Sequence, residues 1–126
     1  MADFVDSNVF IYAFTNNHHK EKCRELLTKE DLVTNTLVLL ETYAKITTIR
    51  SESYAKDVVK GILSSGNIMI VDFSNNLFFE SVKRQAKYRL KISDLVHYIT
   101  SLLNNCSRIV SYDSHFDNLE IERSVP

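Results

Sequence analysis

Short continuous apolar runs alternate along the chain with longer stretches of helical periodicity. The continuous runs predict strands at residues 3–6, 68–71 and 109–112, and the tail at residues 121–126 predicts a final edge strand. The run from Ile68 to Val71 contains no polar position, which is typical of a strand covered on both faces. We therefore expect it to be buried.

Helical spacing fills the segments between these runs. It predicts helices at residues 9–14, 18–27, 36–49, 53–64, about 77–90 and about 93–104. A cap at Thr34, Asn35 or Thr36 is expected to begin the helix at residues 36–49. The positions at helical spacing in the last two helices are Leu77, Phe78, Val82, Ala86 and Leu90, followed by Leu95, Val96, Ile99, Leu102 and Leu103. We expect these positions to face the core.

Short strands that alternate with helices predict an α/β fold, in which a small, mostly parallel sheet lies between helical layers. We expect residues 1–126 to form a single domain, since no linker, repeat or low-complexity segment interrupts the pattern. In such folds ligands bind at the carboxyl ends of the strands. Polar residues at those ends are therefore the candidates for chemistry.

Composition and charge narrow the class of protein. The chain is 44% hydrophobic and 25% charged, with two Gly and one Pro, which excludes a disordered or collagen-like chain. Its net charge of −1 means that nucleic-acid binding must be local rather than a result of overall basicity. Cys23 and Cys106 lack metal-ligand spacing, so we expect buried, reduced thiols in a cytoplasmic protein. No apolar run approaches the ~20 residues that span a membrane.

Some acidic residues lie within apolar sequence rather than on polar faces. Asp6, Asp72 and Asp113 follow strand-like runs, Glu41 lies inside the helix containing LVLL, and Asp94 opens the helix of residues 93–104. Each alone is explained by a helix cap, by the helix dipole or, for Glu41, by a surface pair with Lys45. Together they favour one site, because strand ends and helix amino termini meet at the same edge of a parallel sheet.

Carboxylates that share an apolar cleft are difficult to keep ionised, because burial and mutual repulsion both raise their pKa. A divalent cation removes this conflict. Oxygen ligands without Cys or a clear His cluster favour Mg²⁺ or Mn²⁺ over zinc. The expected chemistry is hydrolysis or transfer at phosphorus, since such a cation lowers the pKa of an attacking water and stabilises charge on phosphoryl oxygens.

The order and setting of these acids resemble those of PIN-domain ribonucleases, and the compact length resembles that of the VapC-like toxins of toxin–antitoxin pairs. The resemblance spans the whole chain and rests on the segments FVDSNVFIYAF, LETYAK, ISDLVHY and IVSYDSHFDNL. It implies a three-layer α/β/α fold and metal-dependent endonucleolytic cleavage of RNA that leaves a 5′-phosphate and a 3′-hydroxyl.

The resemblance also implies roles for individual residues. Asp6, Glu41, Asp94 and Asp113 match the catalytic acids that bind Mg²⁺ or Mn²⁺, and Asp117 falls where some members have a further supporting acid. Ser111 matches the usual Thr or Ser before the late Asp, and Asn8 matches the polar residue that braces the first loop. Asp72 lies outside the motif, so we assign it to capping or solvent.

Two segments depart from the family pattern. Residues 95–98 (LVHY) stand where small residues are usual, and residues 104–106 (NNC) replace a usual Gly before the late strand. Both departures affect the expected shape of the cleft more than its acids. We expect His97 to pack or to form a hydrogen bond, and His115 to be a loop residue beside the cleft rather than a ligand.

A basic cluster precedes Asp94. It consists of Lys83, Arg84, Lys87, Arg89 and Lys91, with Tyr88 among them. Such a run is typical of a solvated helix face. The functional interpretation is a patch that positions RNA phosphates and offsets the acidic cleft.

Two other enzyme classes with aspartates at strand ends do not fit the sequence. A receiver domain requires adjacent acids after its first strand and a late Lys-Pro, and a haloacid-dehalogenase-like phosphatase requires Asp-x-Asp-x-Thr, whereas here Asp6 leads to Asn8. A non-catalytic PIN-fold module for RNA binding or assembly stays open. So does an RNA-processing nuclease without an antitoxin.

Partners follow from the same observations. Apolar helix positions around Tyr54, Val58 and Ile62 exceed what one small core is expected to bury, so we expect a homodimer. The resemblance implies an RNA substrate and an antitoxin protein as further partners. No membrane partner is expected.

Overall fold

The computed structural model describes residues 2–126, and its strands form one parallel sheet. The strands are β1 (Asp3–Val5), β2 (Leu32–Asn35), β3 (Ile68–Val71), β4 (Arg108–Val110) and β5 (Glu122–Ser124). Their order in the sheet is β3-β2-β1-β4-β5, and every neighbouring pair is parallel. The predicted parallel sheet and the final edge strand are confirmed.

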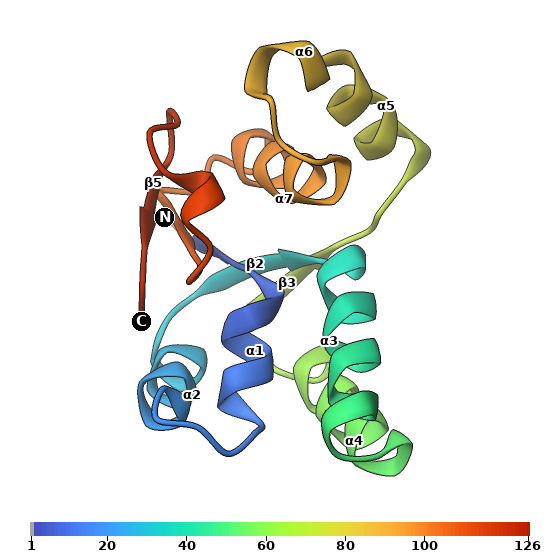
Figure 1. The fold of residues 1–126 in the computed structure, drawn as a ribbon, viewed down its shortest axis with the longest axis vertical. Coiled ribbons are helices and arrows are strands. Elements are labelled where there is room, and N and C mark those ends of the chain that lie inside the picture. The colour runs from blue at the N-terminus through green and yellow to red at the C-terminus, as the bar shows by residue number, and fades with distance from the viewer. Residues whose placement is uncertain (1) are drawn as a thin grey trace.

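Helices cover both faces of this sheet (Figure 1). On one face lie α1 (Ser7–Ala13), α2 (Lys20–Lys29), α3 (Thr36–Ile49) and α4 (Glu52–Leu63). On the other lie α5 (Asn75–Lys83), α6 (Gln85–Tyr88) and α7 (Ile92–Leu103). A single 3₁₀ turn, η1 (Ser114–Phe116), follows β4. The predicted three-layer α/β/α fold is therefore confirmed.

Strand β2 has no counterpart among the predicted strands. It is buried along its whole length, but only Leu32 and Val33 are apolar, and polar Thr34 and Asn35 complete it. So short an apolar pair next to a polar turn does not stand out in the sequence. Asn35 is indeed the cap of α3, because its Oδ1 accepts a hydrogen bond from the amide of Val38 at 2.8 Å.

The prediction that Ile68–Val71 is buried on both faces was wrong. β3 is an edge strand, none of its residues is fully buried, and Met69 is 52% exposed. A continuous apolar run is equally compatible with an edge strand whose outer surface stays open.

The helix expected at residues 77–90 is interrupted at Arg84, and its buried face is narrower than predicted. Leu77 and Leu90 are buried, whereas Phe78 is 51% exposed, and Val82 and Ala86 are also exposed. Contacts of α5 with α7 account for the difference, because they cover the side that carries Leu77 and polar Ser81. Leu103, the last residue of α7, is exposed instead of inward.

The order in which successive strands are added to the sheet reverses beside β1. The chain moves outward from β1 to β2 and β3, and then returns to form β4 on the other side of β1. The carboxyl ends of β1 and β4 therefore form a switch point, where ligands of open parallel sheets bind. Asp6 and Ser111 are the residues that follow these two strands.

The premise of the homodimer prediction needs correction. Val58 and Ile62 are buried in the core, because α4 packs closely against α3. Leu40 and Leu63 are exposed instead, at 61% and 59%, and they line a groove of about 660 Å³ between α3, α4 and β3.

Two smaller expectations concern the thiols and the membrane. Cys23 and Cys106 are buried free thiols, as predicted. Among the described residues, no helix has the length and apolar character needed to cross a membrane.

Candidate metal centre

Asp6 is held in place at the end of β1 by hydrogen bonds to both carboxylate oxygens. Its Oδ1 accepts a hydrogen bond from the backbone amide of Ser7 at 2.7 Å, which caps α1. Its Oδ2 accepts one from the hydroxyl of Ser111, also at 2.7 Å. The side chain is buried, so its position is fixed by β1 and β4 together.

Asn8 and Ser111 join the two loops that follow these strands. The Asn8 amide Nδ2 donates to Asp6 Oδ2 at 3.3 Å, and its Oδ1 accepts from the backbone amide of Tyr112 at 3.2 Å. The Ser111 hydroxyl oxygen also accepts from the backbone amide of Asp113 at 3.0 Å. Asn8 and Ser111 therefore connect the loops after β1 and β4 through hydrogen bonds.

Asp94 lies in the first turn of α7 with its carboxylate turned inward. The residue is only 8% exposed, and its Oδ2 has no hydrogen-bond partner among the described residues. Burial raises the pKa of Asp94 above its ordinary value, and the nearby charges of Asp113 and then Asp6 raise it further. The charges of Asp6 and Asp113 are therefore both close enough to act on Asp94.

Asp113 begins the turn that follows β4. Its Oδ1 accepts a hydrogen bond from the backbone amide of His115 at 2.9 Å. The same turn brings the His115 imidazole back over the site, with Nδ1 3.1 Å from Asp113 Oδ1 and 3.5 Å from Asp94 Oδ2. His115 is therefore a loop residue beside the cleft, as predicted, and it contacts two of the candidate acids.

Glu41 reaches the site from the second turn of α3, where the buried His97 of α7 fixes its position. His97 Nε2 lies 2.8 Å from Glu41 Oε1, and the other ring nitrogen lies 3.1 Å from Asn35 Nδ2. The amide of Val38 donates to Asn35 Oδ1, which fixes the orientation of the side-chain amide and turns its NH₂ group, a donor only, toward His97. His97 Nδ1 is thus the acceptor, and Nε2 carries the proton that is donated to Glu41.

Two groups of side chains offer ligand atoms within 4.8 Å of one another. One contains Asp6, Glu41 and His97, and the other contains Asp94, Asp113 and His115. The four predicted acids are divided between them, and Asp6 also interacts electrostatically with Asp94. A hard divalent cation fits this set, since the donors are mainly carboxylates and one buried oxygen of Asp94 lacks a partner.

The other two acids differ in their surroundings. Asp117 lies beside Asp94 along a pocket of about 270 Å³, but Arg123 Nε donates to its Oδ1 at 2.7 Å. This hydrogen bond lowers the pKa of Asp117 and occupies its carboxylate. Asp72 follows β3, is exposed to solvent and belongs to neither group of ligand atoms.

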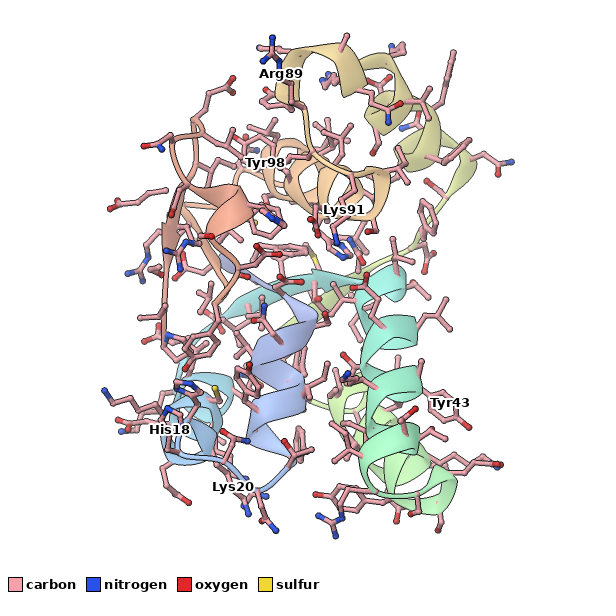
Figure 2. All side chains as sticks on the ribbon, in the orientation of Figure 1. His18, Lys20, Tyr43, Arg89, Lys91 and Tyr98 are labelled. Carbon is pink, nitrogen blue, oxygen red and sulfur yellow. The ribbon has the colours of Figure 1, made fainter. Side chains whose placement is uncertain are left out.

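The basic cluster separates into two parts in the structure. Lys83 and Arg84 pair with Glu80, and Lys87 pairs with Glu120. Arg89 and Lys91 line the same pocket as Asp94 and form no ion pair among the described residues. Figure 2 shows Lys91 near the start of α7, on the side that faces α1 and α3, whereas Arg89 lies at the outer end beside α6.

The two departures in sequence have local explanations. Asn105 adopts the left-handed backbone conformation, with φ of 53°, which Asn tolerates better than most residues other than Gly. His97 and Tyr98 are buried, and the Tyr98 hydroxyl accepts a hydrogen bond from the amide of Ile121 at 3.0 Å. The larger residues of α7 therefore fill space between α7 and the segment before β5.

Comparison with solved structures gives matches over nearly the whole chain. VapC20 of Mycobacterium tuberculosis, a sarcin–ricin loop cleaving toxin, superposes with a TM-score of 0.85 at 13% identity, covering 99% of this chain and 100% of that one. A toxin–antitoxin complex from Klebsiella pneumoniae gives 0.76 at 15% identity, with 99% and 98% covered. VapBC2 of Rickettsia felis, bound to a promoter DNA fragment, gives 0.69 at 16% identity, again with 99% and 98% covered.

At these identities the structural matches establish the fold alone. A search of curated proteins gave no sequence match. The sequence profile of the PIN domain, however, matches residues 4–122, which include β2 to β4, all but the first residue of β1, and all the candidate acids. The chain therefore belongs to the PIN domain family.

Proposed function

We propose that this PIN domain is a Mg²⁺- or Mn²⁺-dependent endoribonuclease that hydrolyses RNA phosphodiester bonds as the toxin of a toxin–antitoxin pair. The observation that carries the proposal is the buried carboxylate of Asp94, which has one unpartnered oxygen and faces Asp113 and Asp6. Such an arrangement is unfavourable for a protein alone, because desolvation and repulsion act in the same direction. A divalent cation between the acids makes it favourable.

The side chains take distinct roles in this proposal. Asp6, Glu41, Asp94 and Asp113 hold the cation, which when bound lowers the pKa of the attacking water and stabilises charge on the phosphate. Asn8 and Ser111 keep Asp6 and the late loop in register through their hydrogen bonds. No protein nucleophile is needed. Asp117 is a supporting residue through its pair with Arg123 rather than a ligand.

The proposed binding partners are supported by the structural neighbours and by exposed apolar residues on the surface. One structural neighbour is described as a toxin that cleaves the sarcin–ricin loop, and two are toxin–antitoxin complexes, which supports an RNA substrate and an antitoxin for this chain. The exposed Leu40 and Leu63 support a protein partner on the α3–α4 groove, where we propose a homodimer. Two buried free thiols are consistent with the cytoplasm.

The cleavage assay that tests the proposal uses total bacterial RNA and intact ribosomes as substrates. Asp6→Asn and Asp94→Asn are expected to abolish metal-dependent cleavage while leaving the far-UV circular dichroism spectrum of the fold unchanged. Asp72→Asn is a matched control, because Asp72 also follows a strand but is exposed and outside the site. Full activity in both site variants would contradict the proposal.

Titration calorimetry with Mn²⁺ separates the nuclease from a non-catalytic PIN-fold module. A nuclease is expected to bind Mn²⁺ in the wild type and to lose that binding in Asp94→Asn. A module with a vestigial site shows no carboxylate-dependent heat. Co-purification with the product of a small adjacent reading frame distinguishes a toxin from an RNA-processing nuclease without an antitoxin.

A further inference from the structure

We propose that His115 supplies a nitrogen ligand to the cation held by Asp94 and Asp113, and that this ligand makes the site favour Mn²⁺ over Mg²⁺. The inference rests on the proposed function only in placing a divalent cation between these acids. The sequence alone predicted that His115 is a loop residue beside the cleft and not a ligand. The proposal makes it a metal ligand that affects which ion binds.

The position of the imidazole is the first observation. Nδ1 of His115 lies 3.1 Å from Asp113 Oδ1 and 3.5 Å from Asp94 Oδ2, so one nitrogen and two carboxylates surround a common point. The turn Ser114–Phe116 holds the ring there, because the backbone amide of His115 donates to Asp113 Oδ1 and Phe116 is fully buried. The ring is anchored by its backbone and not by packing of the imidazole itself.

The second observation concerns Asp94, the partner of His115 across this point. The residue is 8% exposed, and its Oδ2 is the buried oxygen that lacks a hydrogen-bond partner. The 3.5 Å separation from His115 Nδ1 is an electrostatic contact rather than a hydrogen bond. A cation between Nδ1 and Oδ2 satisfies both atoms.

His97, the other histidine of the site, is not available for the same role. Both of its ring nitrogens already have hydrogen-bond partners, Glu41 on one side and Asn35 on the other. Among the described residues, the partners of His115 Nδ1 are carboxylate oxygens of Asp113 and Asp94, and its side chain is 59% exposed, so a cation can reach this nitrogen. Of these two histidines, His115 is the one with an exposed ring whose Nδ1 contacts candidate metal ligands alone.

The choice of metal follows from ligand chemistry. Mg²⁺ is small, demands oxygen ligands and gives up its waters reluctantly, whereas Mn²⁺, a transition ion that also prefers oxygen, tolerates one imidazole nitrogen better than Mg²⁺ does. A set of two carboxylates and one imidazole therefore favours Mn²⁺. Without the imidazole, the remaining carboxylates discriminate less between the two ions.

Two measurements on the purified protein test this inference without using activity. Titration calorimetry with Mn²⁺ alone and Mg²⁺ alone is compared for the wild type and His115→Ala, and the variant is expected to bind Mn²⁺ about tenfold or more weakly. Mg²⁺ binding is expected to change little. Electron spin echo measurements on bound Mn²⁺ are expected to show a nitrogen coupling in the wild type that is absent from His115→Ala.

Controls separate the failure of this inference from failure of the proposed function. His97→Gln is expected to retain the nitrogen coupling, and the exposed His18→Ala is expected to retain wild-type Mn²⁺ affinity. Mn²⁺ binding that depends on Asp94 but is unchanged or strengthened by His115→Ala would overturn the inference and leave the nuclease proposal standing. The absence of Mn²⁺ binding in the wild type would overturn both.

Discussion

His97 donates a hydrogen bond from Nε2 to Glu41 Oε1 over 2.8 Å and so joins the middle of α7 to the second turn of α3 across the site. The chain of contacts continues from His97 Nδ1 to Asn35, the residue that caps α3 and ends β2. The orientation of Glu41 is therefore linked to the sheet through two buried side chains. A carboxylate held in this way is preorganised for a cation.

His97→Ala is expected to lower kcat for RNA cleavage by about 10- to 100-fold, because Glu41 loses the donor that orients it. KM for RNA should change little, since the His97 side chain is buried and has almost no surface that RNA could contact. His97→Gln should recover part of kcat, because its amide can donate to Glu41. Steady-state kinetics on folded variants provide the measurement, and wild-type kcat in both would show that the hydrogen bond has no positioning role.

The metal-free protein should become more stable when Asp94 is replaced by Asn. The folded state raises the pKa of Asp94 above its ordinary 3.8, so its contribution to stability is full below that value and is lost as the pH rises through the folded pKa. Asn does not ionise, so the variant does not lose this stability as the pH rises. Because Asn is neutral, Asp94→Asn removes the desolvation and repulsion that act on the charged carboxylate, and the metal-free variant should be more stable than the wild type at pH 7.

Thermal melting at several pH values checks this expectation. The gain from Asp94→Asn should shrink as the pH falls toward 3.8, and Asp72→Asn, at an exposed position, should show none. Adding Mn²⁺ should reverse the order at neutral pH, because the ion stabilises only the form that binds it. A wild type that is more stable than Asp94→Asn in EDTA at pH 7 would contradict the electrostatic description of the site.

Lys91 should contribute to RNA binding more than Lys83 does. Lys91 lines the pocket beside Asp94 and has no acidic partner among the described residues, whereas Lys83 is paired with Glu80. Lys91→Ala is expected to reduce the slope of log affinity against log salt by about one, and Lys83→Ala should leave it nearly unchanged. Fluorescence anisotropy with single-stranded RNA, performed with Asp94→Asn to prevent cleavage, measures both slopes.

The sequence predicted the layers of the fold because they depend on periodicity, which is local. It did not predict β2, where Leu32 and Val33 are the only apolar residues, or the exposed edge at Met69. Both depend on which strand lies next to which, and strand order is not encoded in any single segment. The outward positions of Phe78 and Val82 have the same origin, since α7 covers only part of α5.

For the site, sequence reasoning identified Asp6, Asp94 and Asp113 because each interrupts or follows an apolar segment at an expected sheet edge. It anticipated packing or a hydrogen bond for His97, but not that Glu41 and Asn35 would be its partners. It did not anticipate that His115 contacts both Asp94 and Asp113, because the path of the Ser114–Phe116 turn is a tertiary property. Nor could the sequence show that Lys83 is paired and Lys91 is not, since nothing in the sequence marks Glu80 as the partner of Lys83.

RNA cleavage by metal-stripped wild-type protein tests the central claim most directly. Protein freed of metal with EDTA is mixed with total bacterial RNA, and cleavage is followed before and after Mn²⁺ or Mg²⁺ is added in excess. We predict no cleavage before addition, and products with 5′-phosphate ends after it. Cleavage that persists undiminished in EDTA, or no cleavage with either ion although Mn²⁺ binds at Asp94, would contradict the account.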